Sequence, residues 1–383
     1  MSTKGYTAGT HRLVDPVETL ARIRPHLAAV GVTRCADVTG LDNLGIPVCC
    51  VVRPAGLTVQ VTSGKGLRPV DAQVSGLMEA IELNHAEHFR PGSLCRTSLR
   101  ALRRGSIDVL DPAELPGFRS DAFFSPDYEI DWVQGVHFSR DEPVWLPASA
   151  VYLCWPALYD FSSNGLASGN DLCEATLHAL YELLERDAVS RLSEHGTLAI
   201  TERCEVLDVA TIDDPVVTAL TGALGRGGVK LVLLTVPSLA DVTTCWAAIL
   251  DPRPFASSTM INVGFGTHLS PSVAASRAIT EAAQGRLTII HGSRDDLIPG
   301  LYRSDKTQAR LWAYFDALRP TCRWQDLPDR STPNLTEDRD LVLSALDRAE
   351  FADIVSVELT RPPFDIPVVK MLVPGLAMNN RLF

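Results

Sequence analysis

A repeated spacing of acidic residues constrains this chain more than any other feature. In the segment 75–82, Ser75, Glu79 and Glu82 are separated by four and then three residues, so they share one face of a helix. The apolar residues of the same segment fall on the opposite face, which would dock the helix onto a core. On one isolated helix, such a polar face is most often simply solvated.

Two further segments repeat this spacing. They place acidic or amide residues at the equivalent positions, namely Glu182 and Glu185 in 178–185, and Glu281 and Gln284 in 277–284. One turn upstream of the second segment, Glu174 adds a carboxylate to the same helical face. Three polar-faced helices with matching spacing predict three walls of one functional site.

The converging carboxylates favour a metal site. Groups that repel one another in this way either stay partly protonated or bind a cation, and the set comprises Glu79, Glu82, Glu174, Glu182 and Glu185. Such oxygen ligands suit Mg²⁺, which usually completes its shell with water and substrate phosphates. Nearby arginines are candidates for phosphate contacts: Arg186, Arg277 and Arg286. A nucleoside triphosphate bound with Mg²⁺ would satisfy both groups, because the ion would neutralise the carboxylates and the phosphates would pair with the arginines.

Simpler interpretations of single residues stay open. Glu174 or Glu281 could pair with a neighbouring arginine, and His178 is the histidine that shares the acidic face. No phosphate-binding loop of the Gly-x-x-x-x-Gly-Lys-Ser/Thr type is present, and the Gly-Phe-Gly at 264–266 lacks the third glycine of a dinucleotide fingerprint. A nucleotide site in this chain would therefore rest on the acidic helices.

Composition narrows the possible partners and the compartment. The 383 residues are 46% hydrophobic and 21% charged, as in an ordinary globular protein. A net charge of −11 argues against nucleic acid as a partner. No apolar run reaches the length of a membrane span and the N-terminus has no apolar signal core, so we expect a cytoplasmic protein without a membrane partner. The nine cysteines form no C-x-x-C pair, which favours buried thiols over zinc ligands or disulfides.

Periodicity and turn residues predict one α/β (α+β) domain over 1–383, built from similar helix–strand–strand units. The units are expected at about 15–90, 163–190, 213–290 and 335–375, and a strand-and-loop insert at 95–162 precedes the second of them. The expected helices are 16–31, the segment through 75–82, the segment through 174–185, 215–224, 271–288 and 338–349. The expected strands are 32–38, 46–52, 57–62, 229–236, 243–250, 260–263, 354–359 and 368–373. Turns are expected at 63–66 and 264–266, a loop at 163–170 and an exposed connector at 320–333.

At these residues the sequence resembles the YcaO family of ATP-dependent peptide-modifying enzymes. Three motifs carry the resemblance: Ser75-x-x-x-Glu79-x-x-Glu82, then Asn170 and Glu174 followed by Glu182-x-x-Glu185-Arg186, and then Glu281-Ala-Ala-Gln284-Gly-Arg286. The stretches 37–42, 46–47 and 63–66 also look like the family. The resemblance covers nearly the whole chain, and the motifs together are far more specific than any one helix.

The resemblance implies a fold particular to that family, with ATP and Mg²⁺ held among the three acidic helices. It assigns metal and phosphate contacts to Glu79, Glu82, Glu174, Glu182 and Glu185. It assigns nucleotide contacts to Ser75, Asn170, Arg186, Gln284 and Arg286. Lys4 and Arg12 are the N-terminal candidates for further nucleotide contacts. No residue is singled out as a general base.

The chemistry implied by the resemblance is ATP-driven activation of a backbone amide in a peptide or protein. A sulfide donor would give a thioamide, a Cys, Ser or Thr side chain an azoline, and an amine an amidine. The segment 374–383 has no Pro-rich tail of the kind common in azoline-forming members, and 4–12 looks like stand-alone members that work with a TfuA-type partner. We therefore favour thioamide formation by a homodimer with a TfuA-like partner. The alternatives are an azoline-forming cyclodehydratase, amidine formation, or a non-catalytic scaffold that presents a peptide.

Overall fold

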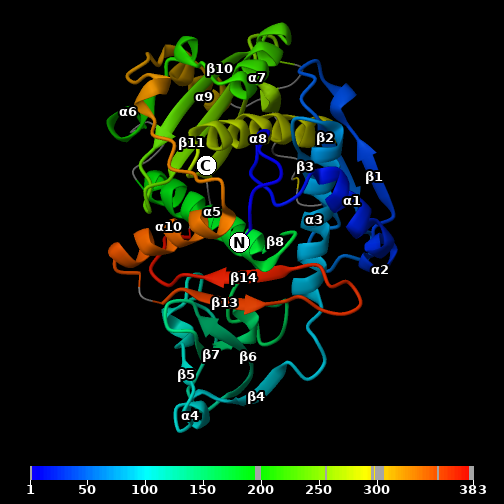
Figure 1. Ribbon diagram of the computed structural model, residues 1–383, viewed down its shortest axis with the longest axis vertical. Helices are drawn as coiled ribbons and strands as arrows, with labels where there is room; N and C mark the ends of the chain where they lie inside the picture. Colours follow the sequence, from blue (N-terminus) through cyan, green and yellow to red (C-terminus); the bar gives the residue numbers. More distant parts are fainter. Residues whose placement is uncertain are drawn as a thin grey trace.

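The structure is a computed structural model, and it describes residues 2–194, 200–254, 257–294, 297, 306–351 and 353–378. It is a mixed α/β fold in which three sheets surround a central group of helices (Figure 1). The fold class expected from the sequence is therefore confirmed. No helix in these ranges is long and apolar enough to cross a membrane.

The first sheet is small and antiparallel, and the first acidic helix packs on it. Its order is β1-β2-β3, with β1 (Arg34–Asp37), β2 (Val48–Val52) and β3 (Val61–Lys65). The helices around it are α1 (Pro16–Ile23), α2 (Leu27–Val30) and the long α3 (Pro69–Glu87). Asp15 caps α1 by accepting a hydrogen bond from the Val17 amide, and Gly31 ends α2 in the left-handed conformation.

The second sheet repeats this arrangement on a larger scale. Its order is β12-β11-β10-β9, with β9 (Glu205–Val206), β10 (Lys230–Val236), β11 (Thr243–Leu250) and β12 (Ile261–His268). The helices beside it are α6 (Ile200–Arg203), α7 (Pro215–Arg226), α8 (Pro271–His291) and α9 (Lys306–Ala317). α8 follows β12 as α3 follows β3, so the first and third acidic helices occupy equivalent places.

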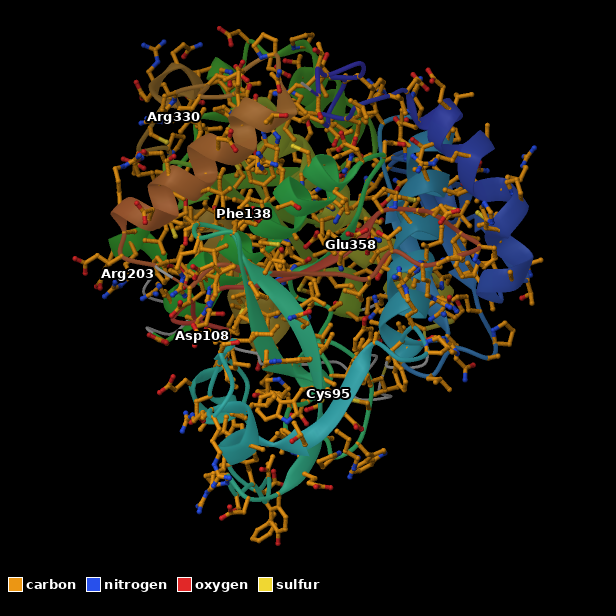
Figure 2. The ribbon with its side chains drawn as sticks, turned by 60° about the horizontal axis from the view of Figure 1, so that its bottom comes forward. Cys95, Asp108, Phe138, Arg203, Arg330 and Glu358 are labelled. Atoms are coloured by element: carbon orange, nitrogen blue, oxygen red, sulfur yellow. The ribbon has the colours of Figure 1, made fainter. Side chains whose placement is uncertain are left out.

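The third sheet joins segments that the sequence analysis assigned to different units. It has seven strands in the order β5-β7-β6-β13-β14-β8, and β4 also pairs with β6. The strands are β4 (Leu94–Ser98), β5 (Asp108–Val109), β6 (Glu129–His137), β7 (Glu142–Pro147), β8 (Leu166–Ser168), β13 (Val355–Glu358) and β14 (Val368–Leu372). The insert and the C-terminal strands thus share one sheet. Figure 2 shows the end of this sheet that carries Cys95 and Asp108 projecting away from the helices, near the short α4 (Leu99–Leu102).

The second acidic helix, α5 (Leu172–Ser193), runs between the sheets and ties them together. Asp171 caps it by accepting a hydrogen bond from the Glu174 amide. Leu180 and Leu184 belong to a hydrophobic cluster shared with β14 and α10 (Leu335–Arg348). Farther along the helix, Val189 belongs to a cluster of the second sheet. Because both ends of α5 are buried on different sheets, its acidic face is held rigidly between them.

Two of the expected turns proved to be strands. Gly64 lies inside β3 and Gly264 inside β12. A Cβ on Gly64 would stand 1.9 Å from the carbonyl oxygen of Ala72, and one on Gly264 would stand 2.4 Å from that of Ala278. These glycines therefore permit α3 and α8 to pack closely on the strands. Glycine occurs here because it has no side chain, and not because the backbone turns.

Other expectations also needed correction. The expected loop at 163–170 contains β8, and the expected strand at 57–62 lies farther along the chain as β3. The connector at 320–333 is not fully exposed, since Cys322 and Trp324 are 7% and 9% exposed and pack in a core cluster with α7 and α8. All nine cysteines are free thiols.

Candidate functional site

The acidic faces of α3, α5 and α8 line one cavity of about 800 Å³. In Figure 1 the three helices surround the N-terminal segment, which runs between them. All of the predicted site residues line this cavity except Lys4 and Arg286, so the lining includes Arg12, Ser75, Glu79, Glu82, Asn170, Glu174, Glu182, Glu185, Arg186 and Gln284. Glu281 lines it as well. The three helical faces that the residue spacing predicted therefore do line one cavity.

The carboxyl groups of the cavity are held in an environment that disfavours their charge. Burial raises the pKa of Glu82 to about 8, and the negative charges of Glu79 and Glu182 add to this effect. Burial also raises the pKa of Glu182 to about 7, with Arg186 opposing and Glu185 adding to the shift. The pKa values of Glu79 and Glu185 are raised by burial too. A bound cation would stabilise the charged form of these carboxyls and so lower their pKa values.

Two cations already neutralise part of the charge. Lys65 forms an ion pair with Glu281, and Arg186 lies 3.1 Å from a carboxylate oxygen of Glu185. Although burial favours the protonated acid, Lys65 and Arg186 hold the pKa of Glu281 below its usual value. Glu281 is therefore a charged member of an ion pair, whereas at Glu79, Glu82, Glu182 and Glu185 the effect of burial on the pKa exceeds that of the nearby cations.

The donor set fits Mg²⁺, although the carboxylates are not gathered into a preformed cage. Among the described residues, no three His, Cys, Asp or Glu side chains stand close enough to share one ion. Mg²⁺ commonly keeps several waters and is held by one or two carboxylates together with substrate phosphates. Buried carboxyls with raised pKa values in a large cavity meet that requirement, and Glu79, Glu82, Glu182 and Glu185 are the cavity-lining residues with such carboxyls.

Glu174 is used differently from the expected metal ligand. Its carboxylate accepts hydrogen bonds from the Leu13 amide at 2.7 Å and from Asn170 Nδ2 at 3.0 Å. The guanidinium of Arg12 lies 3.4 Å from the same carboxylate. Both oxygens of Glu174 are therefore engaged in tying the N-terminal segment across the cavity.

Lys4 and Arg286 lie outside the cavity, contrary to the expectation that they contact the nucleotide. Lys4 Nζ is 2.6 Å from Asp338, with a side-chain exposure of 3%. Arg286 pairs with Asp251 at 2.9 Å and with Asp42 at 3.4 Å, and its side chain is 6% exposed. Both cations already have buried acidic partners, so each is placed to hold chain segments together.

Three polar residues predicted to contact the nucleotide do face the cavity. Gln284 donates a hydrogen bond to the carbonyl of Ser63 on β3, and Asn170 accepts one from Thr19 at 2.9 Å. Ser75 lies on the cavity face of α3, one turn before Glu79. Gln284 therefore links α8 to the first sheet and fixes the width of the cavity.

Some functional candidates were not found from the sequence. Ser168 on β8 donates from its amide and its hydroxyl to Glu82, at 2.8 and 2.5 Å. Lys370 on β14 is 5% exposed, and burial lowers its pKa to about 8 against the opposing charge of Glu182. Lys370 could have been recognised in the sequence, because it is a lysine inside the otherwise apolar run 368–373.

His178 also faces the cavity, as the sequence analysis expected. Burial and the positive charges of Arg12 and Arg277 hold its pKa well below the usual range. The imidazole is therefore neutral at neutral pH and contributes no positive charge for phosphate. Arg277 lines the cavity beside it, and its buried Nε atom has no hydrogen-bond partner among the residues that the structure describes.

The fold and the cavity define an α/β protein with a buried carboxylate site among three helices. The family model described as YcaO cyclodehydratase, ATP- and Mg²⁺-binding, matches residues 63–377. The chain belongs to this family, which confirms the resemblance seen in its motifs. The cofactors in the family description are the ATP and Mg²⁺ expected from the acidic helices.

Relatives and a solved structure extend the match over almost the whole chain. An uncharacterized protein of Mycobacterium tuberculosis (strain CDC 1551 / Oshkosh) is 35% identical, covering 99% of this chain and 85% of its own. An uncharacterized protein of Rhizobium leguminosarum bv. trifolii, named for its place in the tfuA 3′ region, is 33% identical, covering 99% and 91%. The structure of YcaO from Methanopyrus kandleri bound with AMPPCP and Mg²⁺ is 26% identical, with a TM-score of 0.78 and coverage of 98% and 95%.

The raised pKa values predict how the stability of the metal-free protein depends on pH. The folded protein binds protons at Glu82 and Glu182 more tightly than the unfolded chain does, since their pKa values are about 8 and about 7 against an ordinary 4.5. The stability that these protons contribute is fully present below about pH 4.5, and it is lost as pH rises to about 7 for Glu182 and to about 8 for Glu82. Between its unfolded and folded pKa values, each carboxyl should lower the free energy of unfolding by roughly 1.4 kcal/mol per pH unit, and the slope should level off above pH 8.

Calorimetric melting between pH 6 and 9 checks this expectation. The melting temperature of the metal-free protein should fall with pH, and an excess of Mg²⁺ and ATP should reduce the fall. Glu82→Gln should remove part of the slope, whereas Glu337→Gln, an exposed residue of α10, should leave it unchanged. A melting temperature that rises over this range would contradict the assignment.

Proposed function

We propose that the chain binds ATP with Mg²⁺ in the helical cavity and uses the γ-phosphoryl group to activate a backbone amide of a peptide or protein. Members of the family are ATP-dependent peptide-modifying enzymes. The single observation that carries the proposal is the set of buried carboxyls from two helices, with pKa values raised to about 7 and about 8, facing one cavity with several cations. Such an arrangement is costly to the fold without a cationic ligand.

We assign roles to the residues by their position in the cavity. Glu79, Glu82, Glu182 and Glu185 would hold Mg²⁺, and Lys65, Arg186 and Arg277 would hold phosphate oxygens. Ser75, Asn170 and Gln284 would contact the nucleotide. Arg12 is placed to reach the nucleotide from the N-terminal segment, which Glu174 secures. Positioning and charge neutralisation of this kind are the main contributions that proteins make to phosphoryl transfer.

The reaction we favour is thioamide formation with a TfuA-like partner. Hydrogen sulfide adds to the amide carbonyl, the resulting oxyanion takes the γ-phosphoryl group of ATP, and phosphate then leaves as the sulfur gives up its proton, so that a C=S bond replaces the C=O bond and the nitrogen keeps its hydrogen. One observation supports this choice, namely the relative that is named for its place in the tfuA 3′ region. Azoline or amidine formation would use the same activation with another nucleophile. We also propose that the chain is one domain and acts as a cytoplasmic homodimer.

Product mass distinguishes these reactions. The peptides and proteins of cells that carry the gene should include a species in which sulfur replaces oxygen, and deletion of the gene should remove it. Complementation by the wild type should restore the species, and by Glu182→Gln should not. A species that has instead lost one water would identify azoline formation. ATP binding without any modified product in these cells would favour the peptide-presenting scaffold.

A further inference from the structure

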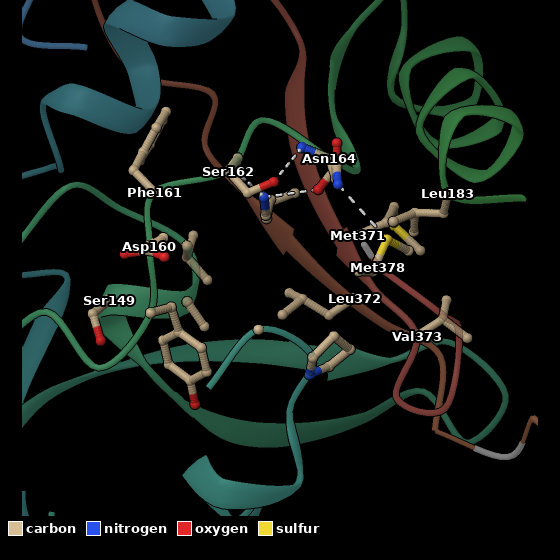
Figure 3. Close-up of a pocket in the computed structure, with 16 residues that line it drawn as sticks. Ser149, Asp160, Phe161, Ser162, Asn164, Leu183, Met371, Leu372, Val373 and Met378 are labelled. Atoms are coloured by element: carbon tan, nitrogen blue, oxygen red, sulfur yellow. Dashed lines mark hydrogen bonds between the residues drawn. The ribbon is translucent and has the colours of Figure 1, made fainter. Parts of the chain in front are cut away.

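A second, smaller cavity lies directly behind the wall of the helical cavity. Its volume is about 70 Å³, and it is lined by β14, the loop before β8, Leu183 of α5 and the segments 116–117 and 149–151 (Figure 3). Apolar side chains dominate its lining, including Leu183, Met371, Val373 and Met378. Figure 3 shows the two methionines beside Asn164 and Leu372 below them.

The wall between the two cavities is thin and rigid. Asn164 lines both cavities, and the consecutive residues Glu182 and Leu183 of α5 line the large and the small one respectively. Lys370, almost fully buried on β14, donates hydrogen bonds to the carbonyls of Ser162 at 2.7 Å and Asn164 at 2.8 Å. These bonds hold the loop that lies between the buried carboxyl groups of the large cavity and the apolar space.

We propose that the small cavity is a specificity subsite that receives a small apolar side chain of the peptide substrate, close to the amide that reacts. This inference rests on the proposed function, because it takes a peptide amide as the group that meets the nucleotide. A chain that places an amide against the carboxylate cavity has its neighbouring side chains within reach of the dividing loop. An apolar lining contributes nothing to a phosphate or a metal ion, and about 70 Å³ is too small for a purine base, so a side chain of the substrate is the occupant that its chemistry fits.

The size and charge of the cavity narrow the occupant further. About 70 Å³ is roughly half of the ~150 Å³ of an apolar protein cavity that binds benzene, which suits an alanine or valine side chain rather than an aromatic ring. Two charged residues line the cavity: Asp160, whose side chain is 72% exposed and lies 3.5 Å from Arg119, and Lys370, which donates to the two loop carbonyls. Each already has a partner, so the lining favours an uncharged side chain. The flexible methionines adjust to branched side chains.

Short diamides test the subsite without knowledge of the natural substrate. The probes are the N-acetyl N′-methylamides of glycine, valine and phenylalanine, and their dissociation constants would be measured by NMR titration of the full-length protein saturated with Mg²⁺ and AMPPCP. The valine diamide should bind more tightly than the glycine diamide, by about fourfold for each buried methyl-sized group. The phenylalanine diamide should gain nothing over glycine.

Two variants link this preference to the cavity. Ala150→Leu fills it at a partly exposed lining position and should abolish the preference for valine, whereas Leu183→Ala enlarges it and should extend the preference to the leucine diamide. Leu341→Ala, on the exposed face of α10, is the matched control. AMPPCP titration of each variant reports folding and the nucleotide site separately.

The possible outcomes separate the subsite from the proposed function. Equal affinities for the glycine and valine diamides, no diamide binding at all, or a valine preference that survives Ala150→Leu would each overturn the subsite. Any of these results with intact AMPPCP binding would leave the nucleotide site standing. A wild-type protein that folds but does not bind AMPPCP would instead contradict the proposed function.

Discussion

Replacing Glu182 by Gln should abolish Mg²⁺-dependent nucleotide binding while leaving the protein folded. Glu182 lies on the cavity face of α5, where its charge acts on both Glu82 and Arg186. Gln keeps the shape of the side chain but removes the negative charge that an Mg²⁺ ion would share. Loss of a supporting group around a metal typically costs 10–100-fold in affinity, so a direct ligand should cost about 100-fold or more.

The same substitution should not destabilise the metal-free protein. Because burial raises the pKa of Glu182 to about 7, its carboxylate opposes folding at higher pH, and its removal relieves that cost. We expect the free energy of unfolding at pH 8 to stay level or to rise by roughly 1–3 kcal/mol. Lower affinity combined with unchanged or higher stability is a signature that general damage to the fold would not produce.

Calorimetric titration of Mg-ATP and urea unfolding measure the two effects. Glu337→Gln makes the same chemical change at an exposed position of α10 and serves as the control. If Glu182→Gln bound Mg-ATP as tightly as the wild type, the carboxyls of α3 and α5 would not form the nucleotide site. If both the wild type and the variant failed to bind, the site would need a partner to complete it, or the chain would act as a scaffold.

The acidic helices could be predicted from the sequence because a helical face depends on spacing alone. Ser75, Glu79 and Glu82 are separated by whole turns, and any helix through them brings them together. The same rule could not say what each side chain meets. Glu174 has the right spacing for the cavity, yet its oxygens are taken by Leu13 and Asn170. The sequence contains no local sign of that contact, since Leu13 lies 161 residues away.

The sheets were less predictable, for two physical reasons. Glycine favours a turn but also permits a helix to approach a strand, and Gly64 and Gly264 serve the second purpose. Pairing between distant strands leaves no local pattern, so β13 and β6 could not be recognised as neighbours although Val355 pairs with His137. The alternation of side chains shows which face of a strand is buried, but it does not show which strand lies beside it.

For Arg286, the motif and the structure indicate different roles, and a substitution can distinguish them. It belongs to the stretch that resembles the family's nucleotide site, but the structure buries it between Asp42 and Asp251, and it also donates a hydrogen bond to the Thr259 carbonyl at 2.9 Å. Removing one partner of a buried ion pair leaves the other charge uncompensated. Arg286→Met should therefore lower the free energy of unfolding by about 3–5 kcal/mol.

Arg277→Met, on the same helix, should behave in the opposite way. Arg277 lines the cavity, and its buried Nε atom has no hydrogen-bond partner within the described part of the chain, so its loss should change stability little and weaken Mg-ATP binding by about tenfold or more. Urea unfolding and Mg-ATP titration at low temperature, where both variants are folded, separate the two effects. Stable Arg286→Met protein that no longer binds Mg-ATP would show that Arg286 leaves its acidic partners for the nucleotide, and that the motif predicts its role better than this structure does.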